Sequence, residues 1–273
     1  MHSNRIFNSP EPFHLAGTGE RASTALLLVH GFTGSPSEFR RGAYYWQDLG
    51  YSVHAIQLPG HGTSPEEMRK TTWKDWMRHV ILSYDRLQQA GYASIFLVGH
   101  SMGGLLSLLL AIKRPVSGVI SLGTPIYVTT YKAAFARVVH PFVPYVTKKP
   151  RRLAQTLDEA CAYDRTPVKC VVCLQKLVRI VKRKLPLVAA PMLILQGMKD
   201  RTVKPHSAAY IYKRCSSSQK RLHYMSESSH SILLDKERED VYRRVDQFVQ
   251  HIVAEKEVQE QPDPISGLIE VMT

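Results

Sequence analysis

The sequence predicts a doubly wound α/β domain, in which helices cover both faces of a mostly parallel sheet. Three observations predict it: short apolar runs recur along the chain, segments with helical periodicity separate them, and a glycine-rich turn joins one run to an apolar helix. The 273 residues, of which 44% are hydrophobic and 22% charged, are enough for one large domain with a sizeable core. This composition excludes a disordered chain.

Six runs rich in Val, Ile and Leu are too short for helices and are typical of buried parallel strands. They are Ala25–Val29, Ser52–Leu58, Ile95–Val98, Gly118–Leu122, Met192–Leu195 and Leu222–Met225. Between them, apolar residues spaced three or four apart predict amphipathic helices over Trp73–Leu87 and, near the end, over Val241–Ile252. This alternation of strand and helix is what a doubly wound sheet requires.

The alternation breaks between residues 125 and 190, which we expect to be an inserted cap. The core is then formed by residues 1–124 and 191–254, and residues 255–273 form a loose tail. The insertion carries 13 Lys and Arg against three Asp and Glu, so most of the net charge of +13 belongs to this one substructure. Such an excess makes an anionic partner worth testing, although it determines no fold.

The cellular location of the protein and the chemical state of its cysteines are predicted from motifs that the sequence lacks. Residues Met1–Pro10 contain no apolar core of a signal peptide, so we expect a cytoplasmic protein. The strongly apolar stretch Leu105–Ile112 is too short to cross a bilayer. The four cysteines are expected to be ordinary buried thiols, because a disulfide scaffold or a zinc site needs further Cys or His partners. They are Cys161, Cys170, Cys173 and Cys215.

The most informative motif is Gly99-His100-Ser101-Met102-Gly103, a G-x-S-x-G sequence between an apolar strand and an apolar helix. The glycines allow a sharp turn that brings the backbone close to its neighbours and lifts the Ser101 hydroxyl out of the sheet. Ser101 is therefore the predicted nucleophile. The backbone N–H of Met102, at the start of the helix, is predicted to face a developing negative charge.

A serine nucleophile needs a histidine base and an acid, which in this fold follow it in the order Ser, Asp or Glu, His. Asp200 comes after the strand that begins at Met192, and His230 comes after the strand that ends at Met225. Both therefore lie at carboxyl ends of strands, where open α/β sheets place their sites. Glu227 and Asp235 are competing acids, but both are sequence neighbours of His230, so Asp200 is favoured.

A second donor to the oxyanion is expected from the loop after an early strand. His30-Gly31-Phe32-Thr33-Gly34 follows the first predicted strand, and the backbone N–H of Phe32 is the candidate. No metal-binding spacing such as H-E-x-x-H occurs, and we expect no metal and no cofactor.

The combination HGFTG, LPGHG, GHSMGG, TPIY, QGMKD and SESSH, spread from residue 30 to residue 230, resembles the α/β-hydrolase superfamily. Within it, the sequence is most similar to small microbial carboxylesterases and monoacylglycerol lipases with a compact lid. The resemblance implies nucleophile Ser101, acid Asp200, base His230 and an oxyanion hole from Phe32 and Met102. It also implies that residues 125–190 are the cap, although a cap rich in Lys and Arg is not part of the family pattern.

The predicted function is hydrolysis of carboxylic esters, either short- to medium-chain acyl esters or monoacylglycerols, through an acyl-serine intermediate. The partner is thus a small-molecule ester; the sequence does not predict an oligomeric state. The same three residue types also serve carbon–carbon bond hydrolysis, perhydrolysis and peptidase activity. A binding module for lipid or nucleic acid with a vestigial triad is a further alternative, but we expect no nucleic-acid partner.

The cap is predicted to hold a basic amphipathic helix. Its apolar residues recur at spacings of three or four: Cys170, Leu174, Leu177, Val178, Val181 and Leu185. We expect this face to cover an acyl pocket whose candidate residues are Phe32, Tyr127, Val128, Phe135 and Leu177. The charged face is either simply solvated or draws the enzyme to anionic membrane surfaces, where each Lys or Arg contributes about 1 kcal/mol.

Overall fold

The computed structural model describes residues 5–129, 143–147 and 163–260. A sheet of seven strands forms its centre, in the order β1-β3-β2-β4-β5-β8-β9, and every neighbouring pair is parallel except β1 and β3. The strands are β1 (Phe13–Leu15), β2 (Thr24–Val29), β3 (Ser52–Ile56), β4 (Ser94–His100), β5 (Gly118–Leu122), β8 (Met192–Gly197) and β9 (Lys220–Met225). The doubly wound α/β prediction is confirmed, with all six predicted strands present.

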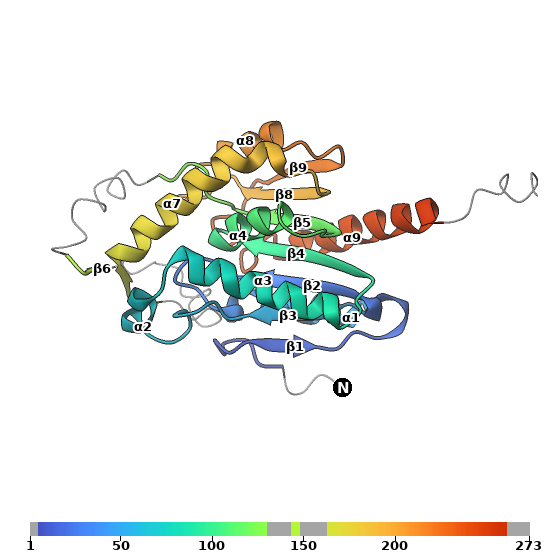
Figure 1. The fold of residues 1–273 in the computed structure, drawn as a ribbon, viewed down its shortest axis with the longest axis horizontal. Helices are drawn as coiled ribbons and strands as arrows, with labels where there is room; N and C mark the ends of the chain where they lie inside the picture. The colour runs from blue at the N-terminus through green and yellow to red at the C-terminus, as the bar shows by residue number, and fades with distance from the viewer. Residues whose placement is uncertain (1–4, 130–142, 148–162, 261–273) are drawn as a thin grey trace, which may run out of the picture.

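Helices cover both faces of this sheet (Figure 1). One face packs against α1 (Arg40–Asp48) and α9 (Arg238–Glu260). The other packs against α3 (Trp73–Gln89), α4 (Met102–Ala111), α7 (Val168–Lys184) and α8 (His206–Arg214). The shorter elements are α2 (Pro65–Lys70), three turns of 3₁₀ helix at Gly19–Ser23, Pro36–Phe39 and Leu185–Leu187, and a small hairpin of β6 (Tyr145–Thr147) and β7 (Arg165–Pro167).

The central strand β2 shows why both faces need a helical layer. Leu26 and Leu28 belong to the core on the α1 and α9 side, whereas Ala25, Leu27 and Val29 belong to the core on the α3 and α4 side. Successive side chains of a strand point to opposite faces, so a run of apolar residues makes both faces hydrophobic. Burial of β2 on both sides follows directly from its composition.

The apolar side of α7, predicted to cover an acyl pocket, packs into the core of the domain. The apolar side of α7 includes Cys170, Leu177 and Val181, which are almost completely buried in the same core as α3 and α4. Figure 1 shows α7 lying beside α4, as part of the helical layer over the sheet. Helical periodicity says only that one face is buried, and it does not say whether that face covers a pocket or the sheet.

The structure also refines the ends of the predicted segments. Helix α9 continues to Glu260, so residues 255–260 of the predicted tail are helical, and residues 261–273 lie outside the described part. Cys170, Cys173 and Cys215 are buried free thiols as predicted, while Cys161 is outside the described residues. Among the helices that the structure describes, none has both the length and the apolar character of a membrane span.

Candidate active site

Ser101 lies in a strained turn between β4 and α4. Its backbone has φ 52° and ψ −117°, which is unusual for a residue with a side chain. The turn is held by a hydrogen bond from the Ser101 N–H to the carbonyl of Leu122 (2.8 Å) on the neighbouring strand. A Cβ on Gly103 would lie 1.8 Å from the carbonyl oxygen of Val29, so no larger residue fits there. The glycine predicted to be necessary is therefore necessary because α4 approaches β2 so closely.

The structure brings together the three side chains predicted to carry the chemistry. The Nε2 atom of His230 is 3.0 Å from Oγ of Ser101, and its Nδ1 atom is 2.7 Å from Oδ2 of Asp200. The three residues are 7% to 9% exposed. Because a carboxylate only accepts, Nδ1 carries the proton, and Nε2 is left to accept one from the Ser101 hydroxyl. This is the arrangement that a serine nucleophile requires.

Asp200 is held in place by further donors. Its Oδ1 atom accepts hydrogen bonds from the backbone N–H groups of Thr202 (2.7 Å) and Val203 (2.9 Å), and Oδ2 accepts another from Gln196 (3.1 Å). Burial by itself raises the pKa of this carboxyl, but the bonds from His230 and the two backbone N–H groups lower the pKa overall. Asp200 is thus an anion beside the histidine.

The two competing acids have other partners. Glu227 is exposed and forms an ion pair with Lys199. Asp235 accepts hydrogen bonds from the backbone N–H groups of Ser229 (2.7 Å) and Lys236 (2.9 Å), which places its carboxylate on the backbone of the loop that carries His230. Only Asp200, of the three candidates, is hydrogen-bonded to the imidazole ring.

The loop with the second predicted oxyanion donor lies directly beside the serine. A Cβ on Gly31 would be 3.3 Å from Cβ of Ser101. The N–H groups of Phe32 and Met102 donate no hydrogen bond within the described part of the chain. Met102 is the first residue of α4, where helical N–H groups lack intrahelical partners. Both N–H groups therefore remain candidates for the oxyanion hole.

Sequence reasoning missed one buried carboxylate at this edge. Oε1 of Glu38 accepts a hydrogen bond from the backbone N–H of Gly31 (2.7 Å) and lies 3.0 Å from Nδ1 of His100. The Nε2 atom of His100 lies 2.9 Å from the backbone carbonyl oxygen of His230. Glu38 precedes its partner by 62 residues, so no local spacing indicates the pair.

The residues proposed for the acyl pocket have different surroundings. The ring of Phe32 contacts Trp76 and His61, and the ring of Tyr127 contacts His206 and Tyr210. Val128 is 42% exposed, whereas Leu177 is fully buried between α7 and the core. Leu177 is therefore a packing residue, and Phe135 lies outside the described residues.

Tyr163, in the insertion, forms hydrogen bonds with the loops near the site. Its hydroxyl donates to the carbonyl of Gly60 (2.6 Å) and accepts from the N–H of Thr63 (3.0 Å). Its own N–H donates to the carbonyl of Thr33 (3.4 Å), in the loop beside Ser101. The part of the insertion at Tyr163, just before α7, thus lies against the strand-end loops.

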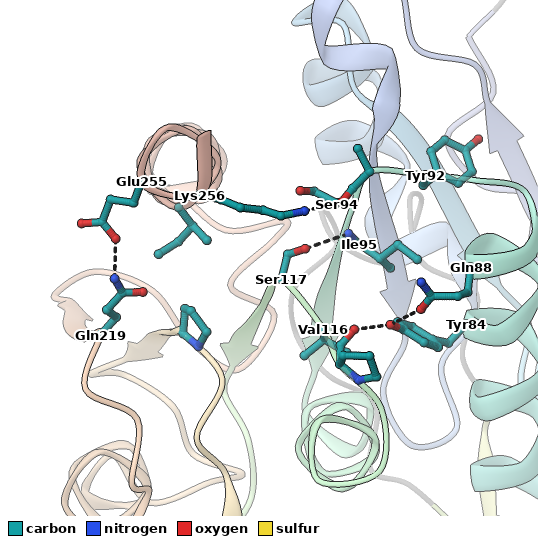
Figure 2. Close-up of a pocket in the computed structure, with 14 residues that line it drawn as sticks. Tyr84, Gln88, Tyr92, Ser94, Ile95, Val116, Ser117, Gln219, Glu255 and Lys256 are labelled. Atoms are coloured by element: carbon teal, nitrogen blue, oxygen red, sulfur yellow. Dashed lines mark hydrogen bonds between the residues drawn. The ribbon is translucent and has the colours of Figure 1, made fainter. Parts of the chain in front are cut away.

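A separate cavity of about 410 Å³ lies at the opposite edge of the sheet, where the strands begin (Figure 2). Its walls include Ser117, Gln219 and Lys256. Lys256 donates to the carbonyl of Ala93 (3.0 Å), and Ser117 accepts from the N–H of Ile95 (3.1 Å). The side chains of Lys256 and Ser117 in this cavity therefore bind backbone groups, whereas those of Asp200 and His230 form a chain that ends at the Ser101 hydroxyl.

Comparison with known proteins connects this geometry to a family. Residues 20–237 match the family model described as serine aminopeptidase, S33. The chain is 31% identical over 247 residues to a carboxylesterase of Bacillus subtilis (strain 168), covering 89% of this chain and 98% of that protein. It is equally 31% identical, over 244 residues, to a thermostable monoacylglycerol lipase of Bacillus sp. (strain H-257), covering 89% and 95%.

A similar solved structure comes from work on LipS and LipT, two metagenome-derived lipolytic enzymes. It superposes with a TM-score of 0.82 at 28% sequence identity and covers 89% of this chain and 98% of that one. The match extends over almost the whole of that protein, so the likeness concerns the complete domain and not a fragment of it.

Proposed function

This chain is an ester hydrolase of the α/β-hydrolase family described as serine aminopeptidase, S33, and we propose that it acts through Ser101, His230 and Asp200. The observation that carries the proposal is the continuous hydrogen-bonded chain from Asp200 through His230 to the strained Ser101. The family description names an aminopeptidase, whereas both bacterial relatives are named as ester hydrolases, which favours ester chemistry over the peptidase alternative.

The proposed reaction begins with attack of Oγ of Ser101 on the acyl carbon of the ester while Nε2 of His230 takes the hydroxyl proton. Asp200 keeps the imidazole in the required tautomer and stabilises the imidazolium. The tetrahedral intermediate then expels the alcohol, which receives the proton from His230. Water, deprotonated by the same histidine, attacks the acyl-serine and releases the carboxylic acid.

The N–H groups of Phe32 and Met102 hold both oxyanions in this proposal. The free N–H at the first residue of α4 also lies at the positive end of the helix, which favours negative charge there. Removal of one such donor raises the barrier in related chemistry by about 2.7–4 kcal/mol, so the two groups account for a large part of the proposed catalysis.

The proposed substrates are short- to medium-chain acyl esters and monoacylglycerols, supported by the names of the two relatives. We further propose that residues 125–190 form the cap of the site, to which the described chain at Tyr163 belongs. The contacts of Tyr163 with the loops at Gly60 and Thr33 support this proposal, because they bring this part of the insertion to the strand-end loops. The cytoplasmic location stays a prediction.

The test is a panel of p-nitrophenyl esters and monoacylglycerols of graded chain length, assayed with the wild type and Ser101→Ala. We expect hydrolysis by the wild type and a loss on the order of 10⁶-fold in the variant, because the nucleophile is gone. A fluorophosphonate should label Ser101 in the wild type and nothing in the folded variant. Wild-type turnover by Ser101→Ala would refute the proposed nucleophile, and peptide cleavage without ester cleavage would favour the peptidase.

A peripheral contact with anionic lipid is a further part of the proposal, and α7 supports it. Lys176, Arg179 and Arg183 are exposed on its outer side. Lys182, by contrast, is half-buried, with Nζ 4.0 Å from the ring centre of Tyr127. The exposed charges, and not Lys182, are therefore the ones available to a membrane surface.

Vesicles of anionic phospholipid test this contact by co-sedimentation. Replacing Lys176, Arg179 and Arg183 with Gln should weaken vesicle binding at low salt by up to about 100-fold, at about 1 kcal/mol per charge. Added salt should also weaken the binding of the wild type, because it screens the charges. The matched control replaces three exposed lysines on other elements, Lys113, Lys213 and Lys236, with Gln. Equal losses in both triple variants would mean that net charge, and not α7, drives binding.

A further inference from the structure

Glu38 connects two parts of the proposed site that are distant in sequence. Its Oε1 atom receives the N–H of Gly31 (2.7 Å), in the loop that offers Phe32 to the oxyanion. The same oxygen lies 3.0 Å from Nδ1 of His100, the residue immediately before Ser101. Glu38 comes from the 3₁₀ turn Pro36–Phe39, and its side chain is 13% exposed. The carboxylate thus joins the oxyanion loop to the nucleophile turn.

His100 continues this connection to the base. Its Nε2 atom lies 2.9 Å from the backbone carbonyl oxygen of His230, and the two imidazole rings are 5.1 Å apart between centres. The His100 ring is buried, and each of its nitrogens has a partner in this network. Glu38 and His100 together therefore touch the oxyanion loop, the nucleophile turn and the loop of the base.

The identity of the partners determines how many protons His100 carries. A backbone carbonyl and a carboxylate that already receives an N–H can only accept hydrogen bonds, so both ring nitrogens of His100 must donate. The ring is then an imidazolium, paired with the anionic Glu38. Burial alone lowers the pKa of His100, but the charge and hydrogen bond of Glu38 raise it overall. Burial likewise raises the pKa of Glu38, and His100 lowers it overall.

His30, at the end of the neighbouring strand β2, provides the contrast. The N–H of Leu58 donates to its Nε2 atom (3.0 Å), while its Nδ1 atom faces the carbonyl of Gly31 (2.9 Å). One ring nitrogen accepts and the other donates, so His30 is neutral, and burial lowers its pKa. The charge on His100 is therefore a product of Glu38 and not of the position at a strand end.

We propose that the largely buried Glu38–His100 ion pair is a positioning element for ester hydrolysis, which holds the Gly31 loop and the backbone of His230 in place beside Ser101. The inference rests on the proposed function of Ser101 and His230. Glu38 and His100 contact no reacting atom; they act by fixing the residues that do. Misplacement of reacting groups by about 1 Å can cost on the order of 100-fold in rate.

An ion pair that works in this way leaves a signature in the pH profile of kcat/KM. When His100 loses a proton, one of its ring nitrogens becomes an acceptor that faces another acceptor. The hydrogen bond to Glu38 or the one to the carbonyl of His230 is then lost. The wild type should therefore lose activity as the pH rises through the raised pKa of His100. The titratable groups around His100 are Glu38, His30 after β2, and His230 and Asp200 after β9 and β8.

The experiment compares Glu38→Gln with the wild type over this pH range. Gln has almost the same shape but cannot stabilise an imidazolium, so the alkaline limb should move to lower pH. At neutral pH, kcat should fall on the order of 10- to 100-fold with little change in KM. In the double variant Glu38→Gln, His100→Gln, kcat should fall no further than in the more severe of the two single variants. Both substitutions remove the same interaction, so their effects are not additive.

Asp85→Asn is the matched control. It breaks another carboxylate ion pair, with Arg114 (2.7 Å), which connects helix α3 to the turn after α4, at the opposite end of α4 from Ser101. The control should lower the melting temperature slightly and leave kcat and the alkaline limb unchanged. It separates loss of an ion pair in general from loss of this one.

Three results would overturn the proposal: wild-type kcat in Glu38→Gln, a fall in kcat with an unmoved alkaline limb, or the same changes in Asp85→Asn. If Glu38→Gln does not fold, ¹⁵N NMR of the histidine rings in the wild type decides, since a neutral His100 ring at a pH below the ordinary histidine pKa of about 6.5 excludes the ion pair. Activity of Ser101→Ala would refute the proposed function itself, and that result is independent of Glu38.

Discussion

The two edges of the sheet are built from the same strands but use their polar residues differently. At the carboxyl edge, Asp200 and His230 direct a chain of hydrogen bonds at the hydroxyl of Ser101, whose own turn is strained. At the amino edge, Ser117 and Lys256 bind backbone groups around a cavity and direct nothing at a common point (Figure 2). Reactivity requires convergence on one atom, and polarity alone does not provide it.

The loops explain why convergence occurs at one edge only. Parallel strands all end at the carboxyl edge, and each is followed there by a loop that can carry a side chain across to its neighbour. The start of α4 adds free N–H groups at the same place. The following predictions test this contrast, beginning with the largest expected effect.

Asp200→Asn should lower kcat for ester hydrolysis by on the order of 10⁴-fold, because Asn no longer enforces the tautomer of His230 that can accept the serine proton. Steady-state kinetics on a p-nitrophenyl ester measures this. Glu227→Gln and Asp235→Asn serve as controls, since their carboxylates bind Lys199 and the loop backbone. A severe loss in either control, with a mild one in Asp200→Asn, would identify a different acid.

Gly103→Ala should destabilise the fold by at least about 1–3 kcal/mol, since its Cβ would lie 1.8 Å from the carbonyl oxygen of Val29. Urea unfolding gives the change in free energy. Gly91→Ala is the comparison at the amino edge: its φ of +80° brings strain, but no atom lies within 4 Å of the added Cβ. Gly91→Ala should cost less and keep full activity; equal costs would show that crowding at the nucleophile turn is not special.

His54 predicts a pH effect on stability that is separate from the carboxyl edge. Burial lowers its pKa to about 4, and its Nε2 atom lies 3.0 Å from the hydroxyl of Tyr92. Between pH 6.5 and 4 the unfolded chain binds a proton here that the folded chain does not, so stability falls as the pH decreases through this range.

His54→Gln should reduce that fall, and unfolding curves at pH 7 and pH 4.5 measure it. The kcat of the variant at pH 7 should equal that of the wild type, because His54 belongs to β3 and has no contact with the proposed triad within the described residues. An unchanged pH dependence of unfolding would show that His54 is accessible to protons in the folded state.

Gln219→Ala should have the smallest effect. Gln219 binds Glu255 at the amino-edge cavity, and the loss of one partly exposed hydrogen bond costs about 1 kcal/mol or less. Thermal unfolding should show a small decrease, and kcat should not change. A reduced kcat in a variant with wild-type stability would mean that the two edges are coupled through the sheet.

Local sequence was enough for six of the seven strands of the central sheet and for the chain order of the three proposed site residues. A short run of apolar residues such as Gly118–Leu122 predicts a buried strand, and the structure has one there. The motif G-x-S-x-G predicts a strand–turn–helix, because only glycine tolerates the contacts that the structure shows at Gly103. The edge strand Phe13–Leu15 was missed, because three residues are too few for a period to be recognised.

Tertiary structure alone decided the place of α7 and the pairing of Glu38 with His100. An amphipathic helix has the same sequence pattern whether its apolar face covers a pocket or a sheet, so only the packing of Leu177 against the core distinguishes them. The charge of His100 depends on a carboxylate 62 residues earlier in the chain, brought within 3.0 Å by the fold. Periodicity and motifs record local constraints, whereas proton positions depend on which groups the folded chain brings into contact.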